Sequence, residues 1–358
     1  MFKRVKMRRR LLVGPVIVLA VLVAIPAAFA AKPGNAPTAK ACQKDGWEGL
    51  RRADGTSFAN EQACTSYGAQ GGVLYPASVG PCLGTGFLTK ATPNGDPFGS
   101  AEACIAFVES NAGTLVSCTR VGTSGDDVLS SAASGEVVCG FGGGDTMTSV
   151  AVGATYYGGP GSDSARDVLG TFDAGADIDS VLNLSGGTYD GGDGNDGLHR
   201  LESGIYNGEA GDDTVSFIFA GAVFNGGDGV DTATLIQGTF NGGLGADVVG
   251  TVEDGGVANG DAGDDRTFVV NAGGVFNGGA GADWVSLELG GVGATFNGEE
   301  GNDAAETVRS GGVVNGGSGD DRVGFLEDGT FDGGDGTDTV CVVAGAFTTT
   351  DVEVTGCG

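Results

Sequence analysis

The chain has 358 residues, of which 72 are glycine, 46 are aspartate or glutamate and only 18 are lysine or arginine, so its formal net charge is −28. Such an acidic chain excludes nucleic acid as a partner, because a phosphate backbone is bound by an excess of positive side chains. Acidic chains either stay expanded by self-repulsion or recruit cations, and the spacing of the carboxylates decides which.

Residues 1–30 have the pattern of an export signal. A basic segment spans residues 3–10, an apolar run spans residues 11–25, and residues 28–30 read Ala-Phe-Ala, a small-x-small cleavage site. The alternative is a membrane anchor, but the run is shorter than the about 20 residues of a spanning helix and is interrupted by Gly14-Pro15. We therefore expect residues 1–30 to be cleaved.

The mature chain is expected outside the cell, secreted or at the cell surface, with no membrane span after cleavage and with residues 31–41 as a linker. Arg8-Arg9 resembles a twin-arginine signal, so the export route stays open. Six of the 18 basic residues lie in the signal and no acidic residue does, so cleavage takes the net charge from −28 to −34.

Residues 42–80 and 82–118 form two tandem copies of one cysteine-containing unit. Cys42, Trp47 and Cys64 in the first copy match Cys82, Phe87 and Cys104 forty residues later. An asparagine or a serine before the second cysteine of each copy predicts the N-cap of a short helix, at Asn60 and Ser100. A bridge within each copy, Cys42–Cys64 and Cys82–Cys104, would stabilise a unit too small for a large core. The aromatic residues are expected to be core, with a carbohydrate or cell-wall contact as the alternative.

Residues 119–340 carry a shorter repeat, GGxGxD, in a segment that has no lysine after Val121. Thirteen copies follow one another at steps of 16 to 20 residues, most often 18, which predicts a solenoid. The closing residues of these copies are Asp127, Asp145, Asp163, Asp179, Asp196, Asp213, Asp231, Asp247, Asp265, Asp283, Asp303, Asp321 and Asp338.

Each repeat predicts two short strands. Apolar residues alternate after each aspartate, as in Val215, Phe217 and Phe219, and a glycine corner then leads to a second strand ending in an aromatic residue such as Phe224. The predicted fold is all-β, a right-handed parallel β-roll or β-solenoid of about 13 turns of about 18 residues, preceded by a small disulfide-rich α+β region. Its second-strand aromatics should align as a ladder.

The glycine-rich loops are candidate calcium sites. Glycine permits close backbone approach, so loop carbonyls can converge with the closing aspartate, and hard oxygen donors suit calcium. The candidate carbonyls are those of Gly191, Gly226, Gly242, Gly278, Gly316 and Gly333. The alternative, a metal-free solenoid with tight turns, explains the glycines but not an aspartate in all thirteen copies, because aligned carboxylates repel one another without a cation. Several ions, up to about twelve, would line one edge of the roll.

The loops resemble the GGxGxD repeat of RTX-type calcium-binding β-roll proteins of exported bacterial origin, over about residues 121–340. The resemblance implies that the closing aspartates bind calcium together with backbone carbonyls of their own and the neighbouring loop. Three loops depart from the motif, since Glu209, Asp261 and Glu299 replace the second glycine, and a fourth has Ala174 and Asp177, which makes the site of Asp179 the weakest. We expect those sites to be empty or distorted.

The ends of the roll are expected to be closed by disulfides, because a terminal turn exposes strand edges. Cys118–Cys139 would close the first turn, and Cys341–Cys357 would fold residues 341–358 over the last.

The leading functional hypothesis is a secreted protein whose β-roll folds on binding extracellular calcium and has a structural or interaction role. The alternative is an adhesin or matrix protein whose cysteine-rich units contact a cell wall, glycan or other matrix component. An enzyme is disfavoured because the chain has no HExxH or GxSxG motif and a single histidine, His199, although carboxylate-only glycoside chemistry stays open.

Overall fold

The computed structural model describes residues 40–110 and 113–355, which form two compact units that divide after Gly80. The predicted signal, most of the linker and Cys357, with its proposed bridge to Cys341, lie outside the described residues. The first unit holds the first cysteine-containing copy. The second unit holds the second copy together with the solenoid, and each unit is considered by itself.

The two cysteine-containing copies share one order of elements. Each has a 3-10 helix, a strand, an α-helix and a second strand that pairs with the first in antiparallel fashion. In the first copy these are η1 (Gly46–Gly49), β1 (Leu50–Arg51), α2 (Glu61–Ala69) and β2 (Tyr75–Pro76), followed by η2 (Ala77–Cys82). In the second they are η3 (Gly86–Thr89), β3 (Lys90–Ala91), α3 (Ala101–Ser110) and β4 (Val116–Ser117).

Both α-helices begin as the sequence predicts. The Asn60 side chain accepts a hydrogen bond of 2.8 Å from the Ala63 amide, and Ser100 Oγ accepts one of 3.2 Å from the Ala103 amide. The disulfides Cys42–Cys64 and Cys82–Cys104 tie each helix to the preceding segment, and all four cysteines are fully buried. Trp47 packs against the core of the first copy, which supports a structural role for this ring.

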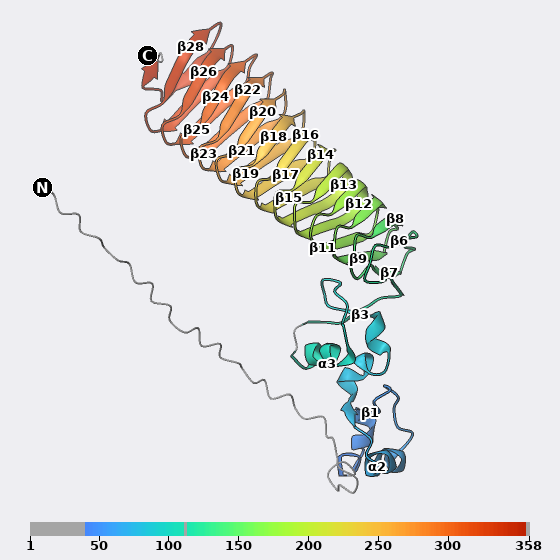
Figure 1. Cartoon of the computed structure of the whole chain (residues 1–358). Helices are drawn as coiled ribbons and strands as arrows, with labels where there is room; N and C mark the ends of the chain where they lie inside the picture. Colours follow the sequence, from blue (N-terminus) through green and yellow to red (C-terminus); the bar gives the residue numbers. More distant parts are fainter. Residues whose placement is uncertain (1–39, 111–112, 356–358) are drawn as a thin grey trace, which may run out of the picture. The chain divides into compact units, whose positions relative to one another are not determined.

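The solenoid consists of two rows of parallel strands (Figure 1). The first row contains the strands that follow the loop aspartates: β6 (Val128–Leu129), β8 (Thr146–Val150), β10 (Ser164–Val168), β14 (Thr214–Ile218), β16 (Thr232–Ile236), β18 (Val248–Val252), β20 (Arg266–Val270), β22 (Trp284–Gly290), β24 (Ala304–Arg309), β26 (Arg322–Glu327), β28 (Thr339–Ala344) and β30 (Val354–Thr355).

The second row contains the strands that lead into the next loop: β5 (Arg120–Val121), β7 (Val137–Cys139), β9 (Thr155–Pro160), β11 (Thr171–Ala176), β15 (Val223–Asp228), β17 (Thr239–Leu244), β19 (Val257–Ala262), β21 (Val275–Ala280), β23 (Thr295–Glu300), β25 (Val313–Ser318), β27 (Thr330–Asp335) and β29 (Thr348–Thr350). Two long strands, β12 (Ser180–Asp193) and β13 (Gly197–Ala210), run around the corner and belong to both rows. The predicted parallel β-solenoid of about 13 turns is therefore confirmed.

Each turn pairs with the next in the register that the repeat predicts. In the first row Val215 pairs with Ala233, and in the second row Phe224 pairs with Phe240. The apolar side chains at alternate positions of both rows point inward and are buried. One continuous apolar core therefore runs through the turns from Leu129 to Val340. No single turn could bury this surface alone.

An aromatic row follows the inner side of the second-row strands, as predicted. Its members are fully buried, and neighbouring rings such as Tyr206 and Phe224 stack with centroids 4.5 Å apart and planes 7° from parallel. Ala258 and Val314 interrupt the row. The row comprises Tyr156, Phe172, Tyr189, Tyr206, Phe224, Phe240, Phe276, Phe296 and Phe331.

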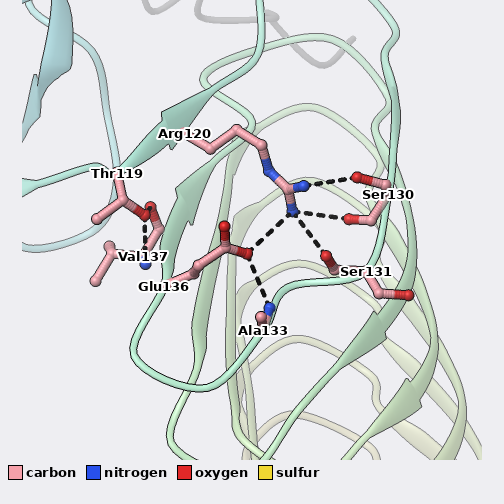
Figure 2. A network of polar contacts seen from close by, with 7 residues as sticks. All are labelled: Thr119, Arg120, Ser130, Ser131, Ala133, Glu136 and Val137. Atoms are coloured by element: carbon pink, nitrogen blue, oxygen red, sulfur yellow. Dashed lines mark hydrogen bonds and ion pairs between the residues drawn. The ribbon is translucent and has the colours of Figure 1, made fainter.

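The first turn of the solenoid is closed by a disulfide and by a polar network. Cys118 and Cys139 form the predicted pair. The Arg120 guanidinium donates hydrogen bonds to Ser130 Oγ at 2.6 Å and to the Ser130 carbonyl at 2.8 Å, and it forms an ion pair with Glu136 (Figure 2). These contacts engage polar groups that have no preceding turn to pair with, which limits the open strand edge.

Candidate metal site

Twelve of the thirteen loop aspartates lie inside the solenoid. Each is at most 2% exposed, although an isolated carboxylate is among the groups least often buried. We call these residues the ladder aspartates: Asp145, Asp163, Asp179, Asp196, Asp213, Asp231, Asp247, Asp265, Asp283, Asp303, Asp321 and Asp338.

One carboxylate oxygen of every ladder aspartate is satisfied by the turn before it. The backbone amide of Asp213 donates to Asp231 Oδ1 at 2.8 Å, and the amide of Asp231 donates to Asp247 Oδ1 at 2.8 Å. The same hydrogen bond, 2.6 to 2.8 Å long, recurs between all consecutive members from Asp127 to Asp338. The aspartates therefore hold the turns in register.

The other carboxylate oxygen, Oδ2, has no hydrogen-bond partner in any of the twelve ladder aspartates and is shielded from solvent. A buried polar group without a partner costs about 1–3 kcal/mol, and more when it is charged. A row of twelve such oxygens therefore requires a proton or a cation on each of them, or on pairs of them.

The carbonyl oxygens of the loop glycines face the same space as the unpaired Oδ2 atoms. A methyl group added at Gly226 would collide with Asp231 Oδ2 and approach the Gly242 carbonyl oxygen of the next turn to 2.6 Å. A methyl group added at the first glycine of the preceding turn would come about equally close to the carbonyl oxygens of Gly226, Gly278, Gly316 and Gly333. In these loops the first glycine has no side chain, so the carboxylate Oδ2 of its own loop and the carbonyl oxygen of the next turn can both come close to its Cα. Gly191 occupies the equivalent register position in the turn after Asp179.

Burial makes the ionised form of the ladder aspartates unfavourable. It raises the pKa of Asp231 and Asp247 to about 6, and burial together with the charge of Asp196 raises the pKa of Asp213 to about 8. Asp179 has the most strongly raised pKa, about 9, because of its burial and of its neighbours Asp196 and Asp163. At neutral pH the row is therefore poised to take up protons or a positively charged ion.

The two ends of the row differ from its middle. Asp127 is half-buried, and its Oδ2 accepts a hydrogen bond of 2.6 Å from the Thr123 amide, so this oxygen is not unpaired. At the other end the amide of Asp338 donates to Glu353 Oε2 at 2.9 Å. Glu353 thus takes the place of a further ladder aspartate, a role that its position outside the repeats does not reveal in the sequence.

The loops that depart from the motif keep its backbone. Glu209, Asp261 and Glu299 adopt the left-handed φ of 70–77° where most other loops have a glycine of positive φ, and they stay in register with the neighbouring turns. Phe141 does the same, with a φ of 84°, in the loop that Asp145 closes. The expected distortion is absent from the backbone. At the fourth departure, Ala174 puts a methyl group where the other ladder loops have glycine, beside Asp179, whose Oδ2 is nonetheless unpaired and buried.

Three tyrosine hydroxyls of the aromatic row also point into this interior and have no hydrogen-bond partner. They belong to Tyr156, Tyr189 and Tyr206. Burial raises the pKa of Tyr206 well above its ordinary value, and the charges of Asp213 and Asp196 raise it further. These hydroxyls therefore lie within the electrostatic influence of the ladder aspartates.

A second polar row, which the repeat motif does not predict, consists mostly of half-buried asparagines. The amide of Asn241 donates to Asn225 Oδ1 at 2.7 Å, and this bond repeats from turn to turn until Asp190 accepts the last one. Its members are Asn207, Asn225, Asn241, Asn259, Asn277, Asn297 and Asn315. The signal was the asparagine before the glycine pair, which is equally typical of an ordinary turn.

Within the described segments no three histidine, cysteine, aspartate or glutamate side chains converge on one point as a metal cluster, and none of the helices there is long and apolar enough to cross a membrane. A cation in the aspartate row would accordingly rely on backbone carbonyls beside the carboxylates. His199 instead packs edge-on against Phe217. Comparison of the chain with protein-family models, with curated proteins and with solved structures finds no match.

Proposed function

We propose that the protein is a calcium-binding β-roll of the RTX type, whose ladder aspartates and loop carbonyls bind several calcium ions along one edge of the solenoid. The observation that carries this proposal is the row of twelve buried, unpaired Oδ2 atoms. Oxygen ligands of carboxylate and carbonyl type are those that calcium prefers.

Calcium fits this row better than protons do under the conditions expected outside a cell. Protons could neutralise the carboxylates, but burial raises the pKa of most ladder aspartates only to about 6 or 7, so a large part of the row would be ionised at neutral pH. A divalent ion neutralises two carboxylates at once and is also coordinated by the carbonyl oxygens. A protonated carboxyl group can donate only one hydrogen bond to a carbonyl oxygen.

The ladder aspartates and the loop carbonyls of Gly226, Gly242, Gly278, Gly316 and Gly333 would hold the ions. Calcium, when bound, supplies the positive charge that permits the carboxylates to be buried. The chain's own contribution is to fix Oδ1 of each carboxylate on the amide of the preceding turn, which directs Oδ2 toward the glycine carbonyl. Binding and stacking of turns would be one process, because no preformed site exists in a separated turn.

We also propose that the protein works outside the cell in a structural or interaction role. The predicted export signal and the three disulfides among the described residues support an oxidising compartment, and extracellular calcium suits modules of moderate affinity. Contact with a wall or glycan through the cysteine-rich units has less support, since Trp47 and Phe58 contribute to the core of their unit.

The test is a calcium titration of the chelated mature protein, with far-UV circular dichroism and bound metal followed together. We expect a cooperative gain of β structure accompanied by several bound ions. A matched pair of variants locates the effect: Asp231→Asn changes a ladder residue, and Asp228→Asn removes the same charge from an exposed position of the same loop. No bound metal, together with a β signal that calcium leaves unchanged throughout the titration, would overturn the proposal.

A further inference from the structure

The aromatic row changes its chemistry along the solenoid. Three of its first four members are tyrosines, Tyr156, Tyr189 and Tyr206, whereas every aromatic member after Tyr206 is phenylalanine. All of these rings are fully buried, and those of the first turns stack on one another in the same way, so packing alone does not require a hydroxyl there.

Burial raises the pKa of each of the three phenols, and the hydroxyls lie near enough to the ladder aspartates for the carboxylate charges to raise it further. Tyr206 and Gly208 are alternate residues of β13 and both point inward, and Asp213 Oδ2 lies in the space beside Gly208. The same spacing relates Tyr156 to Gly158 and Asp163, and Tyr189 to Gly191 and Asp196. In each of these turns the phenol hydroxyl and the carboxylate oxygen are both buried, and they come from neighbouring inward-facing positions of the turn.

Neither group satisfies the other. The Tyr206 hydroxyl and Asp213 Oδ2 are both buried, and both lack a hydrogen-bond partner. Burying a hydroxyl without a partner is unfavourable, and phenylalanine at the same position would avoid the cost. A species that contacts both oxygens would remove both penalties.

We propose that Tyr156, Tyr189 and Tyr206 supply a phenol oxygen to the cation sites beside Asp163, Asp196 and Asp213, so that the solenoid has two classes of calcium site. This inference rests on the proposed function. The N-terminal class has carboxylate, carbonyl and phenol oxygens, while the class beyond Asp213 has only carboxylate and carbonyl oxygens. The added ligand makes the N-terminal sites the first to fill as the calcium concentration rises.

The test compares the full mature protein with its Tyr156→Phe/Tyr189→Phe/Tyr206→Phe variant by calorimetric calcium titration. We expect three sites of the variant to weaken by roughly tenfold each, which corresponds to about 1.4 kcal/mol per site, while the remaining sites stay unchanged. Tyr157→Phe is the matched control, because this neighbouring side chain is only half-buried and lies on the opposite face of β9. If the triple variant fails to fold, single Tyr189→Phe changes one site only.

A gain-of-function variant tests the same inference from the other side. Phe224→Tyr places a hydroxyl beside Gly226 and Asp231 in the turn that follows Tyr206, and one further site should join the tighter class. Terbium emission excited through tyrosine should fall strongly in the triple variant and remain in Tyr157→Phe.

The outcomes separate this inference from the proposed function. Calcium binding by the wild-type protein together with an unchanged titration of the triple variant would overturn the phenol ligands and retain the calcium-binding roll. Absence of calcium binding by the wild-type protein would overturn both.

Discussion

Replacing one ladder aspartate by asparagine should stabilise the metal-free protein, and calcium should remove this advantage over wild type. In the Asp231→Asn variant the new side chain retains an Oδ1 that can accept the hydrogen bond from the Asp213 amide. It replaces the unpaired Oδ2 by an NH₂ group that can donate to the Gly242 carbonyl facing that space. The metal-free fold should gain stability, and the calcium site should be lost.

The magnitude follows from the pKa of Asp231, which burial raises from 3.8 to about 6. The folded state therefore binds a proton more tightly than the unfolded state, and its stability falls as the pH rises from about 4 to about 6. Above this window the carboxylate costs about 3 kcal/mol of folding stability in the absence of metal. Asp231→Asn removes this cost, so the free energy of unfolding in chelator at neutral pH should rise by about 3 kcal/mol.

In excess calcium the variant should lose most of this advantage over wild type, so that the two proteins have nearly equal free energies of unfolding. An ion present at about 100 times its dissociation constant stabilises a folded protein by about 2.7 kcal/mol, and the variant forfeits a large part of this. The assay is urea unfolding of wild type, Asp231→Asn and the exposed control Asp228→Asn, each in chelator and in calcium. Destabilisation of Asp231→Asn in chelator would mean that the ionised carboxylate is already compensated without metal, contrary to this prediction.

Three further predictions follow from the same structure. Thermal unfolding in chelator should shift to higher temperature on acidification from about pH 8 to about pH 5, since most ladder pKa values are raised to between 6 and 9 and the folded state takes up protons; an unchanged melting temperature would contradict this. Asn259→Ala should cost about 1–3 kcal/mol in urea unfolding, because Asn241 and Asn277 each lose a side-chain partner, and a cost near zero would show that water replaces the row. Phe276→Ala should cost about 3–5 kcal/mol by the same assay, because it removes a fully buried ring; a value below about 1 kcal/mol would contradict this and mean that the neighbouring side chains fill the gap.

The repeat spacing was sufficient to predict the fold. A step close to 18 residues with two apolar segments can bury its inner faces only by stacking, and the structure pairs Val215 with Ala233 and Phe224 with Phe240 accordingly. The alignment of the closing aspartates follows from the same register. Their burial does not, because a spacing cannot tell whether Asp231 points into the solenoid or toward solvent.

Other parts of the site depend on contacts that no motif records. Asn241 is compatible with an ordinary turn, and only the parallel register turns it into part of a hydrogen-bonded row. Glu353 accepts the hydrogen bond from the Asp338 amide, although it lies outside the repeat. The role of the tyrosine hydroxyls could not be predicted from the repeat, because a pattern of one aromatic residue per turn does not distinguish Tyr206 from Phe224.

If calcium compensates the buried carboxylates, an X-ray structure of crystals grown in calcium, with anomalous data, should show the ions beside them. We expect anomalous peaks along one edge of the solenoid, each in contact with Oδ2 of a ladder aspartate such as Asp231 and with a loop carbonyl such as that of Gly242. Fully stacked turns whose Oδ2 atoms contact only water or other protein groups, with no anomalous peak beside them, would contradict it.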